Sequence, residues 1–425
     1  MLTVGFIQEN KERVLKSLKI RNYTPIDILD DILSLDKNRK ALQQKLEEQL
    51  AEGNQLATEI KNLFKTGRGA EAAPKKARGA ELKTLNSTVK SALVSVKEAL
   101  ENALLQVPNC ANDQVPAGHS DADNIVHQEW DNELPEMSET ALPHWELAKK
   151  YNLINFELGS KISGAGFPVY VGVGARLQRA LISFFLDEAA AAGYAEYQVP
   201  HLVNEDSARG TGQLPDKEGQ MYYIEKDDLY MIPTAEVPLT NIYRDVIVKQ
   251  KDLPIKLTGH TPCFRREAGS YGAHVRGLNR LHQFDKVEIV QIQHPEKSYQ
   301  ALQEMCQHVE QLLQKLELPY RILLLCGGDI GFTSALTFDF ETYSAAQKRW
   351  LEVSSVSNFE TYQANRLKLR FKDETGKNQL AHTLNGSALA LPRILATILE
   401  NNQSPEGIKV PKALQKYVGL DLIKV

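Results

Sequence analysis

The residues best suited to chemistry gather in one stretch near the middle of the chain. Arg265, Arg266 and Glu267 end an apolar run, and a second run of alternating character carries Phe284 and Glu288. The planar donors of an arginine match two oxygens of a phosphate or carboxylate at once, and an aromatic ring offers a flat apolar surface to a nucleobase. Side chains of these types in one hairpin would suit a nucleoside triphosphate.

A glycine-rich basic segment joins the two runs, so the pattern predicts a strand, a mobile loop and a second strand. Glycines let the backbone approach a ligand and move over it. A simpler alternative is a solvated hairpin face with Phe284 in the core, because short motifs also match by chance. The residues of the predicted loop are Gly269, Gly272, His274, Arg276, Gly277 and Arg280.

A short segment in LYMIPTAEVPLT places a carboxylate directly after an apolar run. Thr234, Ala235 and Glu236 stand between two prolines there. A buried carboxylate needs a cation, and the ammonium group of a substrate would serve. The alternative is a strand end at which Glu236 pairs with a local lysine.

Alternating residues after position 337 predict strands that bring Glu341 and Glu352 forward. Glu352 is followed by Val353, Ser354 and Ser355. Carboxylate and hydroxyl oxygens suit a hard cation such as Mg²⁺ bridging phosphates. The alternative is a polar strand edge.

The sequence HTLNGSALALPRILATIL predicts a strand that ends at Asn385, Gly386 and Ser387, and an apolar helix that begins near Pro392. Proline suits a first helical turn. Arg393 then lies in that turn, where backbone donors and the helix dipole already favour a phosphate.

The first third of the chain predicts two long helices. Leucines and isoleucines recur at three- and four-residue spacing within residues 26–66, and leucines and valines repeat this within 80–106. A glycine- and alanine-rich turn separates them, so an antiparallel hairpin is expected, with a first helix about 60 Å long that should project. Its basic tip suits a nucleic acid backbone, although helical hairpins are also lysine-rich for solubility. The candidate contacts are Lys65, Arg68, Lys75, Lys76 and Arg78.

Residues 107–144 are rich in proline, aspartate and asparagine, which predicts a boundary and not a core. His119, His127 and His144 lie in this segment without a fixed ligand spacing or a cysteine partner. We therefore expect solvated loop histidines here and no metal site.

The composition is typical of an ordinary soluble globular protein. Its 425 residues, 42% apolar, allow a large core and one smaller domain, and a net charge of −4 gives no global attraction to nucleic acid. Four scattered cysteines without a CxxC pair indicate a reducing compartment and argue against a zinc ribbon. The polar N-terminus is unlike a signal peptide, and no stretch approaches a membrane span, so we expect a cytoplasmic protein.

Taken together, these motifs resemble a known family. FRREAG followed by RGLNRLHQFDKVE is similar to the second signature motif of class II aminoacyl-tRNA synthetases, in the wording of seryl-tRNA synthetases. The helix and strand of 174–203 resemble the first motif, and the segment around Arg393 resembles the third. GTGQLP, the TAE and EVSS segments, the helical arm and the closing NNQSPEGIKVPKAL fit the same family.

The resemblance implies an α+β fold, in which helices flank an antiparallel class II catalytic sheet and a helical coiled-coil arm stands at the N-terminus. The expected domains are a tRNA-binding domain over 1–108 with its arm at about 26–106, a linker over 109–145 and a catalytic domain over 146–425.

Roles follow residue by residue from the matching motifs. Arg265 and Arg393 are implied as catalytic: Arg265 neutralises the α-phosphate and the substrate carboxylate, and Arg393 holds the far phosphates. Glu267 reads the adenine amino group, and Phe284 stacks on the base. The ATP-binding set is completed by Arg266, Glu352, Val353, Ser354 and Ser355, of which Glu352 and Ser355 are implied as Mg²⁺ ligands.

The amino acid site is implied in the same way. Thr234, Ala235 and Glu236 match the serine-binding loop, whose threonine and glutamate hold the ammonium group. Glu288 and Ser387 would line the side-chain pocket and hydrogen-bond the hydroxyl of serine, while Arg265 meets its carboxylate. A polar pocket of this kind rejects alanine strongly.

The implied activity is two-step serylation: ATP and Mg²⁺ convert L-serine to seryl-adenylate, and serine passes to the 3′ end of tRNA(Ser), and of tRNA(Sec) where present. The implied partners are tRNA(Ser) through the arm and a second copy of the chain, with no zinc and no membrane. Two departures stand in the third motif. Ala388 replaces a usual glycine and is expected to narrow the pocket floor, and Leu391–Pro392 is unusual for the family.

Three alternatives remain at this point. A class II paralogue that charges a carrier protein would lack the long arm. A non-catalytic tRNA-binding protein would be expected to lose Arg265, Glu267 or Arg393, and all three are present. A plain coiled-coil adaptor leaves the ordered motifs unexplained.

Overall fold

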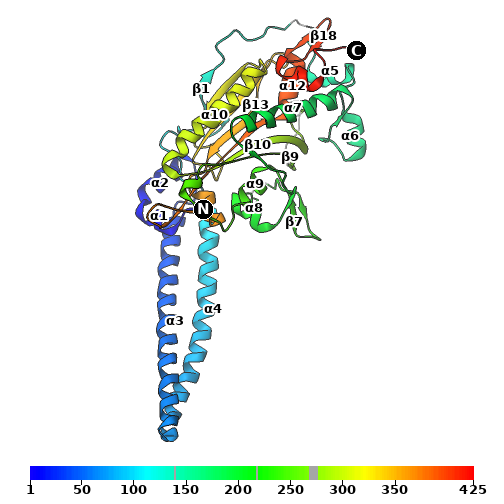
Figure 1. The fold of residues 1–425 in the computed structure, drawn as a ribbon. Coiled ribbons are helices and arrows are strands. Elements are labelled where there is room, and N and C mark those ends of the chain that lie inside the picture. The colour runs from blue at the N-terminus through cyan, green and yellow to red at the C-terminus, as the bar shows by residue number, and fades with distance from the viewer. Residues whose placement is uncertain (138–139, 217–218, 268–275) are drawn as a thin grey trace. The chain divides into compact units, whose positions relative to one another are not determined.

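A computed structural model of the protein describes residues 1–137, 140–216, 219–267 and 276–425. The chain forms two compact units: Met1–Leu18 with Tyr23–Pro108, and Lys19–Asn22 with Asn109–Val425 (Figure 1). Among the described residues, none of the helices combines the length and apolar character that a bilayer crossing requires.

The first unit is helical. Short helices α1 (Val4–Glu9) and α2 (Lys11–Ile20) precede the two long helices α3 (Ile28–Lys65) and α4 (Ala73–Gln106), which run antiparallel side by side (Figure 1). A single 3₁₀ turn, Gly69–Ala72, joins them. The predicted hairpin is therefore confirmed, and α4 begins before the expected position 80 because Pro74 fits the first helical turn, where its missing N–H is not needed.

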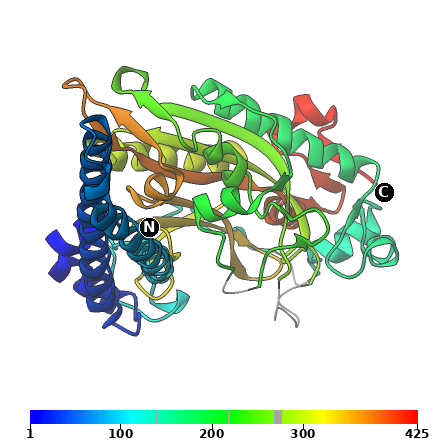
Figure 2. The same ribbon diagram turned by 90° about the horizontal axis from the view of Figure 1, so that it is seen from below.

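The second unit is built on an eight-stranded sheet in the order β1-β11-β12-β13-β16-β10-β9-β4. All neighbouring pairs are antiparallel except β4 with β9. The turned view in Figure 2 shows β9 and β10 as long curved ribbons. The strands are β1 (Ile125–Glu129), β4 (Ala195–Glu196), β9 (Ile255–Phe264), β10 (Gln283–Gln293), β11 (Tyr320–Leu324), β12 (Leu336–Ser344), β13 (Arg349–Asn358) and β16 (His382–Ala390).

Three helices cover one face of this sheet and form the main core with it: α7 (Val173–Ala191), α10 (Ser298–Lys315) and α12 (Leu391–Asn401). The strands alternate in side-chain direction. Val287 and Ile289 of β10 therefore enter the core, while Lys286 and Glu288 point to the other face. That other face is where the functional side chains gather.

Smaller elements complete the second unit, and α8, α9 and α11 pack near the face opposite the core helices. The helices are α5 (His144–Lys150), α6 (Phe156–Ile162), α8 (Glu205–Thr211), α9 (Glu236–Asn241), α11 (Tyr362–Leu367) and α13 (Lys412–Val418). The strands are β2 (Ile154–Asn155), β3 (Val169–Tyr170), β5 (Leu202–Val203), β6 (Tyr223–Ile224), β7 (Leu229–Met231), β8 (Ile247–Lys249), β14 (Arg370–Lys372), β15 (Asn378–Leu380), β17 (Gln403–Ser404), β18 (Gly407–Lys409) and β19 (Leu422–Ile423).

The segment after the arm is more than a boundary. Its strand β1 pairs with β11 at the edge of the main sheet, and Cys110 and Val115 are buried. The expectation that its histidines are solvated is correct for His127 and wrong for His144, which is fully buried at the start of α5. Burial is tolerated because Glu400 of α12 lies against the ring, a partner more than 250 positions away that local composition does not reveal.

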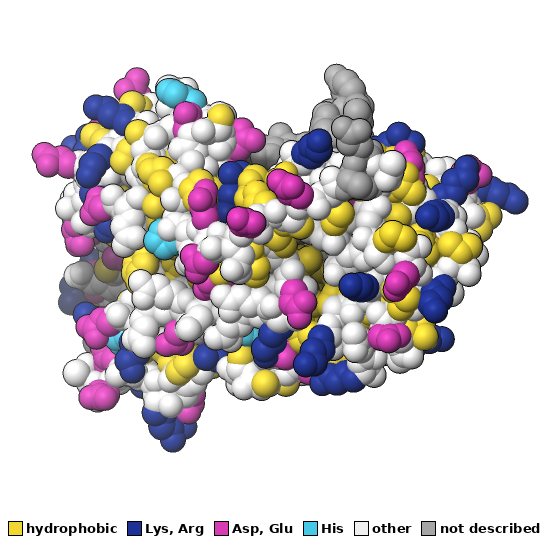
Figure 3. Space-filling view, turned by 90° about the horizontal axis from the view of Figure 1, so that it is seen from above, with side chains coloured by type: hydrophobic (Ala, Val, Ile, Leu, Met, Phe, Trp, Pro, Cys, Tyr) yellow, Lys and Arg dark blue, Asp and Glu magenta, His cyan; other side chains and the backbone are white. Residues whose placement is uncertain are grey.

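Charge is mixed over the surface of the second unit. On the face drawn in Figure 3, basic and acidic side chains alternate, and apolar side chains are exposed between them. This face carries no broad field of one sign, in line with the net charge of −4.

Candidate active site

A cavity of about 490 Å³ lies on the face of the sheet opposite the core helices. Its walls come from the β9–β10 hairpin, from β13 and β16, and from the first turn of α12. The structure thus brings together residues that are far apart in the sequence. The predicted site residues that line the cavity are Thr234, Glu236, Arg265, Glu267, Phe284, Glu288, Glu352, Val353, Ser354, Ser355, Ser387 and Arg393.

Two predicted site residues do not line this cavity. Ala235 is fully buried in a small apolar cluster with Leu239 and Val290. The guanidinium of Arg266 lies 6.0 Å from the centre of the Tyr222 ring. Gly269, Gly272 and His274 of the predicted loop lie outside the described residues.

The two predicted catalytic arginines reach the cavity from different elements. Arg265 follows β9, and its guanidinium lies over the Phe284 ring at 5.4 Å from the centroid. Arg393 lies in the first turn of α12, as predicted, and its Nη1 donates to the carbonyl of Glu352 at 2.7 Å. A cation and an exposed ring face side by side can receive a phosphate and a base.

Glu267 is held in an unusual backbone conformation at the end of the first hairpin strand. Its φ of +47° lies in the left-handed region that side chains other than glycine rarely adopt. Its carboxylate forms an ion pair of 2.8 Å with Arg280, which lies on the other side of the hairpin. The pair joins the two sides of the hairpin, and both residues line the cavity.

Oxygen atoms that could bind a metal gather on β13, which lines the cavity, and on its neighbouring strand β12. Ser354 donates to the carbonyl of Ser387 at 2.6 Å, so this hydroxyl is committed to the sheet. Ser355 lies opposite Asp339, and its hydroxyl hydrogen-bonds that carboxyl group. Burial, and then repulsion from Glu352, raise the pKa of Asp339 well above its ordinary value.

This group of oxygens fits a hard cation. Within the described part of the chain, Asp339 Oδ1 is buried without a hydrogen-bond partner, and no group of three or more acidic, cysteine or histidine side chains is arranged so that it could hold a metal ion. Glu352 and Ser355 therefore remain the candidate ligands, and Asp339 is an acidic neighbour that the sequence reading did not single out. A cation there would relieve the repulsion between the two carboxylates.

One side of the cavity is organised around Glu288, which is 1% exposed. Its carboxylate accepts from Thr234 Oγ1 at 2.9 Å and from Asn385 Nδ2 at 3.1 Å, and it pairs with Lys286 Nζ at 2.6 Å. A buried carboxylate with three donors keeps a fixed position. A ligand hydroxyl must therefore join or displace one of these partners.

Glu236 is buried beside this cluster. Gln363 Nε2 donates to it at 2.7 Å, so the alternative of a local lysine partner is wrong for Glu236. Burial, followed by repulsion from Glu288, raises the pKa of Glu236 to about 7. Lys286 pairs with Glu288, whereas Glu236 accepts from a neutral amide, and an incoming ammonium group would supply positive charge to Glu236.

The prediction that Ala388 narrows the pocket floor is wrong. This residue is fully buried in the core on the helix-covered face of the sheet, so its methyl group does not narrow the cavity. The strand also continues past Ser387 to Ala390, which carries Ala388 to the opposite face. Pro392 does line the cavity, in the first turn of α12.

Sequence reasoning missed several partners of the amino acid site. Lys286 could have been found, because it lies two positions before Glu288 and strand alternation puts both on one face. Gln363 and Asn385 come from other elements, and no local pattern connects them with Glu236 or Glu288.

The tip of the arm has a different character. Lys65 and Lys76 are exposed, and the ammonium nitrogen of Lys76 lies 4.7 Å from the centre of the Phe64 ring. The remaining three candidate cations have glutamate partners: Arg68 with Glu71, Lys75 with Glu59, and Arg78 with Glu52 and Glu81. Glu52 and Glu59 come from the opposite helix, so the tip is less basic than its own residues suggest.

Comparisons with known proteins agree with this arrangement. The family model described as Seryl-tRNA synthetase N-terminal domain matches residues 1–111, and that of the tRNA synthetase class II core domain (G, H, P, S and T) matches 222–402. A serine–tRNA ligase of Salinibacter ruber is 47% identical over 421 residues, covering 99% of this chain and 98% of that protein. One of Hydrogenobaculum is 43% identical over 419 residues, covering 98% and 99%.

A crystal structure of seryl-tRNA synthetase from Pyrococcus horikoshii complexed with ATP has a TM-score of 0.91 to this structure at 32% identity, and the match covers 100% of this chain and 99% of that one. The predicted α+β class II fold is confirmed by this match. The chain therefore belongs to the seryl-tRNA synthetase family of class II aminoacyl-tRNA synthetases.

Proposed function

We infer that the protein is an ATP-dependent serine–tRNA ligase, which activates L-serine as seryl-adenylate and transfers serine to the 3′ end of tRNA(Ser). The observation that carries this inference is one cavity with two arginines on its nucleotide side and two buried carboxylates, one of them paired with Lys286, on its amino acid side. The first set suits a polyphosphate and the second suits an ammonium group beside a hydroxyl.

In the activation step, an oxygen of the serine carboxylate attacks the α-phosphorus of ATP. A new P–O bond forms, the bond to the β-phosphate oxygen breaks, and diphosphate leaves. Arg265 is assigned to the carboxylate and the α-phosphate, and Arg393 to the outgoing phosphates. The protein contributes position and charge to this step, since no covalent bond to the enzyme is required.

The nucleotide base is assigned to Phe284 and Glu267. The ring already has the Arg265 guanidinium over one region of its face, so a base that stacks there lies beside a phosphate donor. When Mg²⁺ is bound, it supplies positive charge to the phosphates. Glu352 and Ser355 would hold it, with Asp339 as an acidic neighbour.

Serine selection is assigned to Glu236, Thr234 and Glu288. The ammonium group meets Glu236, whose ionised form it favours, and the hydroxyl of serine reaches Glu288 and Ser387. Alanine lacks the hydroxyl that would join the donors of Glu288, so it forgoes this hydrogen bond, which is a basis for rejection.

In the transfer step, a terminal ribose hydroxyl of the tRNA attacks the carbonyl carbon of seryl-adenylate and releases AMP. We assign tRNA(Ser), and tRNA(Sec) where a cell has it, to the helical arm, with Lys65, Arg68, Lys75, Lys76 and Arg78 as contacts. The active form is assigned as a homodimer, and its compartment as the cytoplasm. The domain limits 1–108, 109–145 and 146–425 belong to the same proposal.

Attachment of labelled serine to total tRNA in the presence of ATP tests this function, with threonine and alanine as control amino acids. Serine-selective charging is the expected result. Formation of seryl-adenylate without charging of tRNA would indicate the carrier-ligase paralogue. The absence of both reactions would overturn the assignment.

A further inference from the structure

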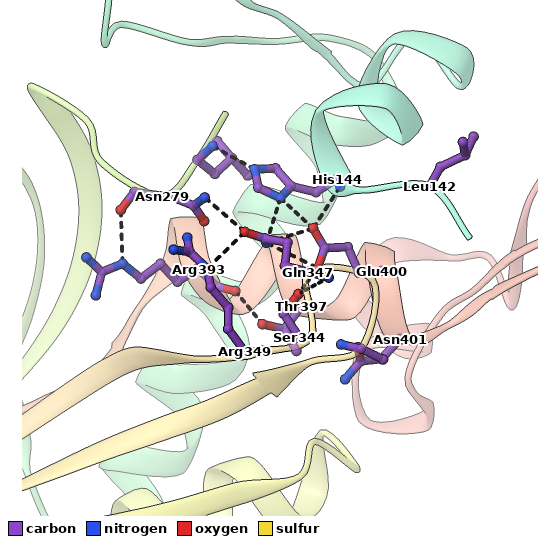
Figure 4. A network of polar contacts seen from close by, with 12 residues as sticks. Leu142, His144, Asn279, Ser344, Gln347, Arg349, Arg393, Thr397, Glu400 and Asn401 are labelled. Carbon is purple, nitrogen blue, oxygen red and sulfur yellow. Dashed lines mark hydrogen bonds and ion pairs between the residues drawn. The ribbon is translucent and has the colours of Figure 1, made fainter. Parts of the chain in front are cut away.

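A buried polar network links the start of α5 to the end of α12 (Figure 4). His144 Nδ1 lies 2.7 Å from Glu400 Oε1, and the backbone N–H of His144 donates to the same oxygen at 2.8 Å. Burial alone would raise the pKa of Glu400, but hydrogen bonds from His144 and Ser344 hold it below its ordinary value. Glu400 is therefore an ionised acceptor inside the protein.

The other ring nitrogen of His144, Nε2, faces the backbone of Gly277 and Leu278 in the β9–β10 hairpin. The backbone N–H of Leu278 donates to His144 Nε2 at 2.8 Å, so Nε2 bears a lone pair and Nδ1 carries the proton given to Glu400. A methyl group at Gly277 would lie 2.2 Å from Nε2, and the φ of +70° there also requires glycine. The imidazole is thus a neutral bridge seated directly on this backbone.

The same backbone reaches the nucleotide side of the cavity. Leu278 and Asn279 line the cavity, and the carbonyl of Asn279 accepts from Arg393 Nε at 3.0 Å. Asn279 Nδ2 donates to Gln347 Oε1 at 3.1 Å, and Gln347 Nε2 donates to Glu400 Oε1 at 2.9 Å. The contacts form a closed circuit, from His144 through the hairpin backbone and Gln347 to Glu400 and back to His144.

Arg393 and Glu400 stand on one helix, seven positions apart, which places both on the same side of α12. The circuit therefore anchors the hairpin backbone to the helix that carries Arg393. It also fixes the position of the Asn279 carbonyl, which accepts a hydrogen bond from the Arg393 guanidinium. The sequence motifs gave no role to Gln347 or Glu400, and the composition of its segment placed His144 in solvent.

We propose that His144 is a positioning residue for ATP: it fixes the backbone of Gly277 to Asn279 against α12 and thereby orients Arg393 toward the phosphates. The proposal rests on the proposed function of the cavity. It assigns to His144 no contact with substrate, and it predicts an effect on ATP that serine does not share, because the serine cluster is held by Thr234, Lys286 and Asn385.

Two variants of His144 separate the links of the circuit, and a third variant serves as a control. His144→Asn has a shorter side chain that can still donate to Glu400 but does not reach the Leu278 N–H. His144→Gln offers an amide N–H to Glu400 and an oxygen acceptor to Leu278. The matched control is His308→Asn, which changes another buried histidine, on α10, away from the cavity lining.

Serine-dependent ATP–pyrophosphate exchange is the first measurement. Loss of a buried hydrogen bond predicts a KM for ATP raised about tenfold or more in His144→Asn, a KM for serine within about twofold, and recovery of most of the ATP effect in His144→Gln. Equal rises in both KM values, or an unchanged KM for ATP, would overturn the proposal. His308→Asn is expected to leave both KM values near those of the wild type.

A double-mutant cycle tests the route through Arg393. If His144 acts by orienting this guanidinium, the effects of His144→Asn and Arg393→Lys on ATP will be strongly non-additive, whereas additive effects would contradict that route. Should His144→Asn fail to fold, Gln347→Leu cuts the circuit at its less buried side. It is expected to raise the KM for ATP about threefold, and a wild-type value would count against the proposal.

Calorimetric binding of a non-hydrolysable ATP analogue with Mg²⁺ keeps this inference separate from the proposed function. A wild type that binds the analogue but shows no serine-dependent exchange would refute the serine assignment alone. Binding about tenfold weaker in His144→Asn than in His308→Asn would still support the positioning role. Equal binding in the two variants, or no binding by the wild type, would overturn it.

Discussion

Two ion pairs of nearly equal length show how differently this protein uses charge. At the tip of the arm, Arg78 and Glu52 meet at 2.7 Å with side chains 41% and 42% exposed. In the cavity, Lys286 and Glu288 meet at 2.6 Å with side chains 8% and 1% exposed. Water screens the pair at the arm tip, so each of its partners can bind a different ion instead. Water does not reach the pair in the cavity, so nothing replaces a partner that is lost there.

The comparison explains why the two regions suit different ligands. A glutamate on the arm can be released and a phosphate bound in its place at little cost. In the proposed amino acid site, Lys286 pairs with Glu288, and Glu236 accepts from the neutral amide of Gln363, so a substrate ammonium group would supply the positive charge for Glu236. The arm would bind a polyanion through exchangeable contacts, and the cavity would select a small cationic group through fixed ones.

Removal of the buried lysine should have the largest effect. Lys286→Met removes the ammonium partner of the buried Glu288 carboxylate, so we expect the free energy of unfolding to fall by about 3–5 kcal/mol. Urea-induced unfolding measures this loss. The control Lys315→Met breaks an ion pair with Glu188 whose lysine is 48% exposed, and it should change stability by less than about 1 kcal/mol. Equal losses in both variants would remove the distinction between buried and exposed pairs.

Loss of the central carboxylate should act on one substrate. Glu288→Ala is expected to raise the KM for serine about 100-fold and to leave the KM for ATP within about twofold, because the carboxylate lies on the amino acid side of the cavity. Exchange assays that vary each substrate in turn measure both constants. A similar rise for ATP would show that Glu288 supports the whole cavity and not serine binding in particular.

The pH dependence of serine binding should follow Glu236. Burial and Glu288 raise its pKa to about 7 from an ordinary value of 4.5. Protonation of Glu236 therefore stabilises the folded state fully below about pH 4.5, and this contribution is lost as the pH rises through about 7. Over the same range, the ionised form of Glu236, which binds ammonium, becomes more populated. The KM for serine should fall from about pH 6 to about pH 8, and Glu236→Gln should abolish this trend. A wild-type KM for serine that is constant over that range would contradict the assignment.

The smallest effects are expected at the arm. Arg78→Gln should raise the KM for tRNA about threefold and weaken its salt dependence, with serine-dependent exchange unchanged. Glu52→Gln removes the charge of one of the two glutamate partners of Arg78, while Glu81 remains, and should shift the KM for tRNA in the opposite direction. Two results would contradict the interpretation that the arm binds through exchangeable ion pairs. One is a tip variant that alters serine-dependent ATP–pyrophosphate exchange, and the other is a Glu52→Gln variant that weakens tRNA charging.

The sequence determined much of this protein because the relevant patterns are local. Helical periodicity located α3 and α4, strand alternation located β9 and β10, and Pro392 marked the first turn of α12. The motifs also contained most of the residues that line the cavity, since a strand presents alternate side chains to one face.

The tertiary structure decided what the charged groups do. A composition rule placed His144 in solvent, yet Glu400 makes it a buried bridge. Counting residues made the arm tip strongly basic, yet Glu52 and Glu59 lie across the hairpin from Arg78 and Lys75. The state of a charge depends on its neighbours in space and on its exclusion from water, and the fold brings those neighbours from distant parts of the chain.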